Sequence, residues 1–354
     1  MGYYLPALIR QMLMFIKKFT FAQIRCLLAG FTSIMINKSI KFLLRIIIAI
    51  GFPFTFLASL WLKALRVVGM SKLDEKIFMK VGMLPIIDHY YQPLVNPKKH
   101  LTQSLRKDRN LPGIDMNTNG QLELLAQFNY ADELKQFPLA KVDELTYYYN
   151  NGFYESGDAE YLYNMVRHFK PRKVVEIGSG YSTLMAQNAF RKNKAEDVNY
   201  NYTQVCVEPY EQPWLEKTGV EVIRKRVETI EKSFFEELEP KDILFIGSTH
   251  MIRPQGDVLF EYLEILPVIK PGVIVHIHDI FLPKDYPDAW ILDEHRLWNE
   301  QYLLEAFLTF NDKFRILGAV NYLSHAYNKE FSAKHPVYGS QPGREPGAFW
   351  MVRV

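Results

Sequence analysis

The side chains best suited to proton transfer follow a short apolar run of the sequence. Residues 243–246 have the composition of a buried strand, and strands of this kind often deliver an acidic residue to an active site. This run delivers Gly247 instead, and Ser248 and His250 follow it. Histidine exchanges protons near neutral pH more readily than other side chains do. We therefore predict that His250 acts as a general base.

A second group of such side chains ends another apolar run, residues 273–278. Side chains alternate along a strand, so His276 and His278 lie on one face of it. His276 stands deeper in the run and is expected to pack inside the protein. His278 is the second candidate for the base. Asp279, the next residue, is expected to orient the base or the substrate.

A metal ion is another way to activate a substrate at this place. Hard cations such as Mg²⁺ bind several oxygen ligands, and Gly247 offers none. Asp279 remains, Asp257 could add a carboxylate, and His250, His278 and Asp279 could form a softer site. Because the oxygen set is incomplete, we expect chemistry without a metal. A divalent cation stays the less favoured alternative.

The elements that must position these residues alternate along the chain from about residue 158. Nearly continuous apolar strands separated by helices predict a mostly parallel sheet covered by helices on both faces. No helix is expected between the last two strands, which therefore predict an antiparallel hairpin at one edge. The expected strands are 173–178, 203–208, 221–225, 242–247, 273–278, 314–323 and 347–354. The expected helices are 158–169, 182–191, 212–218, 228–238, 256–268 and 293–309.

A glycine turn follows the first of these strands. The strand ends near Glu176, and Gly178 and Gly180 then allow a sharp turn and close approach of a ligand to the backbone. The helix behind the turn offers free N–H groups. The second strand ends at Glu208, whose carboxylate can accept hydrogen bonds from two ribose hydroxyls. This edge of the sheet therefore predicts a site for a ribose-containing cofactor.

Two cofactor classes fit a glycine turn followed by a ribose-binding acid. A dinucleotide site requires a third glycine beside the pyrophosphate, and Thr183 stands at that position. S-adenosylmethionine contains a ribose but no phosphate, so it does not require that glycine. Glu176 would repel a pyrophosphate but tolerates a cationic amino acid. S-adenosylmethionine is therefore favoured over NAD.

At this point the chain resembles the class I S-adenosylmethionine-dependent methyltransferases. The resemblance covers about residues 150–354 and extends to the branch that methylates hydroxyls of sugars and other natural products. It implies a Rossmann-like fold with a seven-stranded, mostly parallel sheet and helices on both faces. The matching segments are VVEIGSGYST (174–183), VCVEP (205–209), DILFIGSTH (242–250) and LPVIKPGVIVHIHDI (266–280). The likeness to that branch rests on GFYESGDAEYLYNMVRHFKP (152–171), which resembles the helix before its glycine turn.

The resemblance implies a cofactor site built from the glycine turn and the ends of the next strands. Glu176 would orient the turn, Glu208 would bind the ribose, and Val227 with Glu228 would lie near the adenine. The residues implied are Glu176, Gly178, Ser179, Gly180, Tyr181, Ser182, Glu208, Val227, Glu228, Gly247 and Ser248.

The N-terminal region has the composition of a membrane anchor. Residues 46–62 contain no charge, which is near the short limit for a membrane-spanning helix, and Gly51 and Pro53 interrupt them. Residues 5–19 have the pattern of a basic amphipathic helix at a membrane interface. Basic residues on both flanks favour a bent segment over a single span. We expect a membrane-associated protein with its catalytic domain on the cytoplasmic side; a helical subdomain packed on the protein itself is the alternative.

Charge and cysteine content narrow the remaining function classes. The first 72 residues carry ten Lys or Arg and no acid, which leaves −7 for the other 282 residues. A nucleic-acid groove in the main domain is therefore not expected. Cys26 and Cys206 are too far apart for a disulfide framework or a zinc motif. The expected regions are an anchor over 1–72, a connector or cap over 73–150, and a methyltransferase domain over 151–354.

These observations predict an O-methyltransferase that uses S-adenosylmethionine. The expected acceptor is a hydroxyl on a sugar, a lipid-linked glycan or another membrane-associated small molecule. Gly247 keeps one alternative open, because an enzyme that has lost an acid there could act as a membrane-bound binding or scaffold subunit.

Overall fold

The computed structural model describes residues 42, 45–46, 48–89, 91–93 and 96–354. Contacts divide the chain into two compact units, residues 1–96 and 97–354. The first unit contains α4 (Phe52–Val68) and α5 (Lys72–Val81). Helix α5 begins at a reciprocal cap, in which Ser71 Oγ accepts from Asp74 N and Asp74 Oδ2 accepts from Ser71 N.

The predicted membrane localisation is wrong. Within the described residues, no helix is both long enough and apolar enough to cross a bilayer. The apolar run is divided at Gly51, the residue before α4, and Lys63 and Arg66 stand in the second half of that helix. The uncharged part of α4 therefore spans only about 16 Å, against a hydrocarbon core of about 30 Å. The predicted amphipathic helix over residues 5–19 lies outside the described residues.

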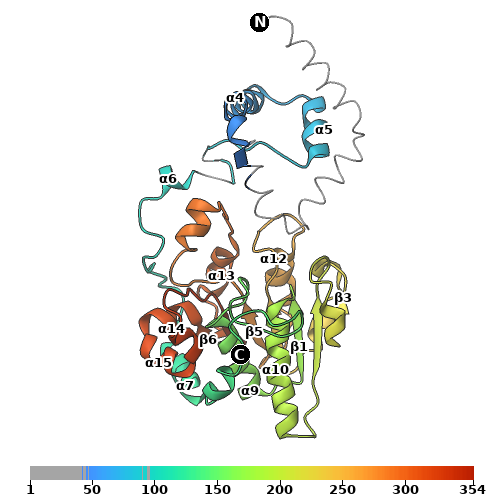
Figure 1. The fold of residues 1–354 in the computed structure, drawn as a ribbon, viewed down its shortest axis with the longest axis vertical. Helices are drawn as coiled ribbons and strands as arrows, with labels where there is room; N and C mark the ends of the chain where they lie inside the picture. Colours follow the sequence, from blue (N-terminus) through green and yellow to red (C-terminus); the bar gives the residue numbers. More distant parts are fainter. Residues whose placement is uncertain (1–41, 43–44, 47, 90, 94–95) are drawn as a thin grey trace, which may run out of the picture. The chain divides into compact units, whose positions relative to one another are not determined.

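The second unit is built on a seven-stranded sheet with the order β3-β2-β1-β4-β5-β7-β6 (Figure 1). Strands β1 to β5 pair in parallel, and β7 pairs antiparallel with both β5 and β6. The chain order changes direction between β1 and β4, which is where open sheets of this kind bind ligands. The strands are β1 (Lys173–Ile177), β2 (Thr203–Val207), β3 (Glu221–Ile223), β4 (Ile243–Ile246), β5 (Ile274–Ile277), β6 (Phe314–Ala319) and β7 (Phe349–Arg353).

Helices connect and cover these strands. The α-helices of this unit are α6 (Pro97–His100), α7 (Thr118–Gln127), α8 (Ala131–Leu134), α9 (Asp158–Phe169), α10 (Tyr181–Glu196), α11 (Ser233–Glu236), α12 (Asp257–Phe260), α13 (Glu300–Leu308), α14 (Val320–Ala326), α15 (Asn328–Lys334) and α16 (Pro336–Gly339). Short 3-10 segments are η1 (Leu215–Thr218) and η2 (Val227–Thr229), and π-helical segments are η3 (Glu261–Ile265) and η4 (Ala289–Asp293).

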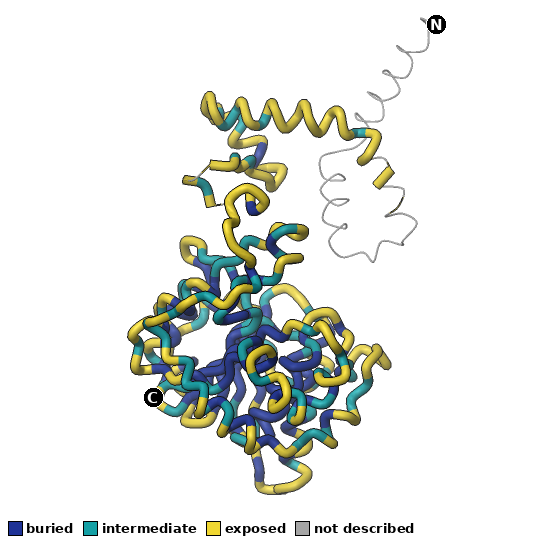
Figure 2. The backbone as a smooth tube through the Cα atoms, turned by 90° about the vertical axis from the view of Figure 1, so that its left-hand side faces the viewer, coloured by how far each residue is buried: buried dark blue, intermediate teal, exposed yellow. Residues whose placement is uncertain are grey.

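Two apolar clusters form the core, one on each face of the sheet. Val174 and Phe245 pack with α9, α10 and the helices between β6 and β7, whereas Val175 and Leu244 pack with α11 to α13. The strand alternation that separates Val174 from Val175 thus assigns the two faces. Figure 2 shows the buried backbone of this unit concentrated in its interior. The sheet edge that carries the chemistry is therefore held from both sides.

The predicted α/β class and mostly parallel sheet are confirmed, with one topological correction. The last two strands do pair antiparallel, but three helices, α14 to α16, lie between them. The run 314–323 leaves the strand conformation after Ala319, and Val320 and Leu323 are buried at helical spacing. A short, mostly apolar run fits a buried strand as well as a helix, so the sequence pattern did not separate the two.

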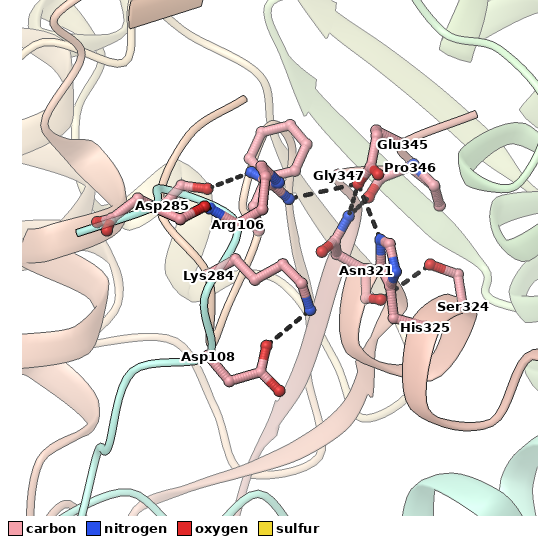
Figure 3. A network of polar contacts seen from close by, with 12 residues as sticks. Arg106, Asp108, Lys284, Asp285, Asn321, Ser324, His325, Glu345, Pro346 and Gly347 are labelled. Atoms are coloured by element: carbon pink, nitrogen blue, oxygen red, sulfur yellow. Dashed lines mark hydrogen bonds and ion pairs between the residues drawn. The ribbon is translucent and has the colours of Figure 1, made fainter. Parts of the chain in front are cut away.

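A polar network fastens the segment before α7 to loops at the sheet edge (Figure 3). The Arg106 guanidinium donates to the Asp285 carbonyl oxygen at 2.7 Å and to Glu345 at 3.3 Å. Lys284 Nζ donates to Asp108 at 2.7 Å. These contacts join residues 106–108 to the loops after β5 and before β7, which border the candidate site.

Candidate active site

Two adjoining cavities open at the carboxyl ends of the parallel strands. The first has a volume of about 480 Å³ and the second of about 470 Å³. Each lies within the size range of small-molecule sites. They share a wall, so they form one cleft with two halves. The residues common to both are Gly178, Glu208, Glu211, Gly247, Ser248 and Thr249.

Gly178 and Gly247 bring the ends of β1 and β4 into backbone contact. Gly178 has a φ of +78°, and a Cβ there would lie 2.0 Å from the carbonyl oxygen of Gly247. Gly247 N donates to Ile177 O at 2.8 Å. A Cβ on Gly247 would lie 3.1 Å from Cε1 of Phe245. Glycine at 247 therefore keeps open the wall that both halves of the cleft share.

Glu176 lies beneath the glycine turn and is almost fully buried. Its carboxylate accepts hydrogen bonds from Ser182 Oγ and, at 2.6 Å, from Thr183 Oγ1. Thr183 Oγ1 also accepts from Gly180 N at 3.1 Å. Burial raises the pKa of Glu176 to about 7, against the lowering effect of these hydroxyl donors. Glu176 therefore contacts the turn and the start of α10 instead of the cleft.

Glu208 lines both halves of the cleft at the end of β2. One carboxylate oxygen accepts from Ser179 N at 3.3 Å, and the other accepts from Tyr210 N at 3.0 Å and Glu211 N at 2.9 Å. These bonds fix the carboxylate beside the glycine turn. The remaining predicted cofactor residues line one half or the other: Ser179, Gly180, Tyr181 and Ser182 the first, Val227 and Glu228 the second.

His250 is buried in the wall of the first half, between two carboxylates. Its Nδ1 lies 2.7 Å from Glu300 Oε2, and its Nε2 lies 3.4 Å from Asp279 Oδ2. The backbone of His250 has a φ of +59°. Its carbonyl oxygen accepts from Asn299 N at 3.1 Å and from Glu300 N at 3.2 Å. The start of α13 therefore holds both the backbone and the ring of His250.

A second buried acid lies close to Glu300. Glu261 is fully buried, and burial together with the Glu300 charge raises its pKa well above the usual range. Ser248 Oγ donates to Glu261 Oε2 at 2.9 Å. Two neighbouring buried acids cannot both ionise cheaply. The neutral form of Glu261 is therefore favoured beside Glu300.

His278 forms a further charged group on the same wall. Its Nε2 lies 3.6 Å from Asp279 Oδ1 and 3.8 Å from Asp158 Oδ2. Burial alone would lower the pKa of His278, but Asp279 and Asp158 outweigh it and raise that pKa to about 9. His276, in contrast, is fully buried between the Phe245 and Trp350 rings, and burial lowers its pKa well below the usual range.

The acids near the cleft are not arranged as a metal site. Among the residues that the structure describes, no group of three or more His, Cys, Asp or Glu is placed to hold a metal ion. Asp257 instead accepts from Thr249 N at 3.0 Å and from Thr249 Oγ1 at 2.8 Å. This carboxylate therefore fastens the loop after β4.

Several residues of the site escaped the sequence analysis. Glu300 is the first residue of α13. The predicted helix 293–309 begins seven residues earlier, so the sequence places this acid inside a helix and not at its start. Asp158 stood at a predicted helix start, and its carboxylate accepts from Gly347 N at 3.0 Å and Ala348 N at 2.7 Å. For Asp158, an acid at a predicted helix start was the signal available in the sequence. The contact of Glu300 with His250, 50 residues away, carries no local signal.

Sequence comparison relates part of this chain to known proteins. Residues 175–280 match the family model described as a methyltransferase domain. An uncharacterized protein of Archaeoglobus fulgidus is 30% identical over 177 residues, which cover 47% of this chain and 78% of that protein.

Solved structures give weaker likenesses. The O-methyltransferase from Bacillus cereus in complex with S-adenosylhomocysteine is 16% identical, with a TM-score of 0.29, over 66% of this chain and 90% of that one. CalS11, a TDP-rhamnose 3'-O-methyltransferase of calicheamicin biosynthesis, is 13% identical, with a TM-score of 0.35. The match covers 71% of this chain and 99% of that one. On the sequence match over residues 175–280, the chain contains a methyltransferase domain.

Proposed function

We propose that this chain methylates a hydroxyl group of a small molecule, such as a sugar or another natural product, with S-adenosylmethionine as the donor. The observation that carries the proposal is the His250–Glu300 pair, whose imidazole lines the cleft beside the glycine turn. This arrangement matches the requirement of an oxygen nucleophile for a base held in place by a third group.

The cleft fits the donor in shape and charge. Gly178 and Gly247 expose backbone at the shared wall, where added side chains would collide or narrow the space. Glu208 offers carboxylate oxygens suited to ribose hydroxyls, and the acids of the cleft suit a cationic sulfonium compound. In this proposal Ser179, Gly180, Tyr181 and Ser182 surround the methionine part, Val227 and Glu228 lie near the adenine, and Ser248 lies between these two regions.

When bound, S-adenosylmethionine supplies an electrophilic methyl group. The protein aligns the acceptor hydroxyl with it and removes the hydroxyl proton. His250 Nε2 accepts that proton, and Glu300 stabilises the resulting imidazolium through Nδ1–H. Asp279 Oδ2, 3.4 Å from Nε2, adds a second negative charge that stabilises the imidazolium. His278, held by Asp158 and Asp279, keeps Asp279 in place. A positioned base of this kind contributes about 10²–10⁴-fold to the rate.

The test compares turnover with cofactor affinity in the wild type and in H250N. Formation of S-adenosylhomocysteine is measured with a panel of free sugars and phenols as acceptors. We expect transfer to at least one hydroxyl compound, a loss of about 10²-fold or more in H250N, and an unchanged affinity for S-adenosylhomocysteine. Full turnover in H250N would remove the assigned base. Tight cofactor binding without transfer to any acceptor would favour a binding subunit.

A further inference from the structure

The segment between β5 and α13 adds two indoles and a guanidinium to the wall of the first half of the cleft. Trp290, Arg296 and Trp298 all line this cavity, and we call them the Trp–Arg–Trp unit. Arg296 Cζ lies 5.0 Å from the Trp290 ring centroid and 5.2 Å from that of Trp298. The two indoles lie 5.1 Å apart at 71°. The guanidinium is therefore in cation–π contact with both rings.

Packing and backbone bonds hold this unit in place. Arg296 N donates to the Trp290 carbonyl oxygen at 2.7 Å, which closes the loop between them. The Trp290 ring packs edge-on against buried Phe281 at 5.3 Å. The Trp298 ring lies 4.5 Å from the His250 ring. Trp298 thus contacts both Arg296 and the proposed base, so the unit and the base belong to one wall.

The charge of Arg296 is opposite to that of the acids in the same cavity. Glu208, Glu211 and Asp279 line it as well. Those carboxylates suit a cationic donor, whereas a guanidinium suits an anion. Glu294 contacts Arg296 Nε at 2.5 Å, and the Arg296 side chain remains 41% exposed. This geometry keeps the terminal amino groups of the fork available for a second anionic partner.

We propose that the Trp–Arg–Trp unit binds the methyl acceptor, and that this acceptor is a hydroxylated ring compound carrying a carboxylate or a phosphate. The ring packs against an indole face, and the anionic group pairs with Arg296. The hydroxyl to be methylated then lies towards His250, because the Trp298 ring contacts both Arg296 and His250. This assignment rests on the proposed function, since it takes the part of the cavity beside His250 as the acceptor site of a methyltransferase.

The test uses ligands that differ only in their charged group. D-glucose, D-glucuronate and glucose 6-phosphate form one series, and 4-hydroxybenzyl alcohol and 4-hydroxybenzoate form another. Each is titrated by calorimetry and by tryptophan fluorescence, with and without saturating S-adenosylhomocysteine. We expect the anionic member of at least one series to bind about 10-fold or more tightly than its neutral counterpart. The carboxylate and phosphate arms identify which anion is preferred.

Three variants assign any preference to Arg296. R296Q removes the charge and is expected to abolish the preference for the anion. R296K keeps the charge but loses the flat fork and is expected to retain part of it. R315Q removes an exposed charge on β6, outside both cavities, and is expected to bind as the wild type does.

The outcomes separate this inference from the proposed function. Equal binding of neutral and anionic members, binding of neither, or an anion preference that survives in R296Q would overturn it. Failure of S-adenosylhomocysteine to bind would count against the proposed function, while the titrations without it would still measure the anion preference.

Discussion

At the scale of single residues, the chemistry depends on how His250 is held. Its identity as the candidate base could be predicted from its place after an apolar run. Its partner could not, because Glu300 reaches Nδ1 from a helix 50 residues further along the chain. Glu300 is fully buried. Burying an acid is costly unless it is paired or hydrogen-bonded, and His250 provides that partner.

The first prediction concerns Glu300. In E300Q the amide keeps the shape of the side chain but cannot carry the charge that stabilises the imidazolium. We expect kcat to fall by about 10–10²-fold, with little change in the affinity for S-adenosylhomocysteine. Steady-state kinetics and calorimetry measure the two quantities. E305Q, which alters an acid of the same helix that pairs with Arg109 instead, is the matched control. A fall in cofactor affinity equal to the fall in kcat would show a structural role instead.

The second prediction concerns Gly247, where the sequence led us to expect an acid. A Cβ there would lie 3.1 Å from Phe245 Cε1, so the ring must move by a few tenths of an ångström, and a carboxylate would enter the wall shared by both cavities. We expect G247D to fold but to lose turnover by about 10-fold or more, with or without Mg²⁺. G247A separates the effect of volume from that of charge. A gain of activity in G247D, or a new Mg²⁺ requirement, would mean that glycine replaced a working acid.

At the scale of elements, the site is formed by strand ends, a glycine turn and the start of α13. The strand ends were predictable, since continuous β-branched and apolar runs predict buried parallel strands and place their carboxyl ends at one edge. The loop 294–299 was not, because its aromatic and charged residues also fit the helix predicted over 293–309. Tertiary packing of Trp290 and Trp298 at the cavity decided the conformation there.

The third prediction tests the backbone contact between β1 and β4. A Cβ in G178A would lie 2.0 Å from the Gly247 carbonyl oxygen, and no side-chain movement can relieve a clash with backbone. We expect the free energy of unfolding to fall by more than about 3 kcal/mol, or the variant not to fold.

Gly219 provides the control for that variant. It has nearly the same φ, +79° against +78°, but a Cβ there has no atom within 4 Å. G219A should therefore lose only the cost of a left-handed alanine, about 1–2 kcal/mol. Chemical denaturation measures both variants. An equal loss of unfolding free energy in G178A and G219A would show that the close approach at Gly178 does not affect stability.

At the scale of the whole molecule, the polar network of Figure 3 links the segment before α7 to the loops that border the cleft. Glu345 is its central acid, with His325 Nε2 and Asn321 Nδ2 each at 3.0 Å and Arg106 at 3.3 Å. Burial raises the pKa of Glu345, but the His325 and Asn321 hydrogen bonds and the nearby positive charges lower it to about 2.

The fourth prediction follows from that lowered pKa. A carboxylate whose pKa is lower in the folded state stabilises the protein above its unfolded pKa of about 4.5, and this stabilisation is lost as the pH falls towards 2. The side chain is 37% exposed, so solvent screening limits the contribution to about 1–2 kcal/mol. We expect E345Q to be less stable than the wild type at pH 7 and the difference to shrink between pH 4.5 and pH 2. Denaturation at several pH values measures this. A stability difference that does not depend on pH would contradict the role of the Glu345 charge. The control is E123Q, which replaces an exposed acid of α7.

The central claim is that the cleft at the ends of β1, β2 and β4 binds S-adenosylmethionine through Glu208. Calorimetric titration of S-adenosylhomocysteine into the wild type and E208Q tests it most directly, with E221Q on the exposed edge of β3 as the control. We expect one binding event per chain in the wild type and in E221Q, and a loss of about 10–10²-fold in E208Q. No binding to the wild type, or equal affinity in E208Q, would contradict the account.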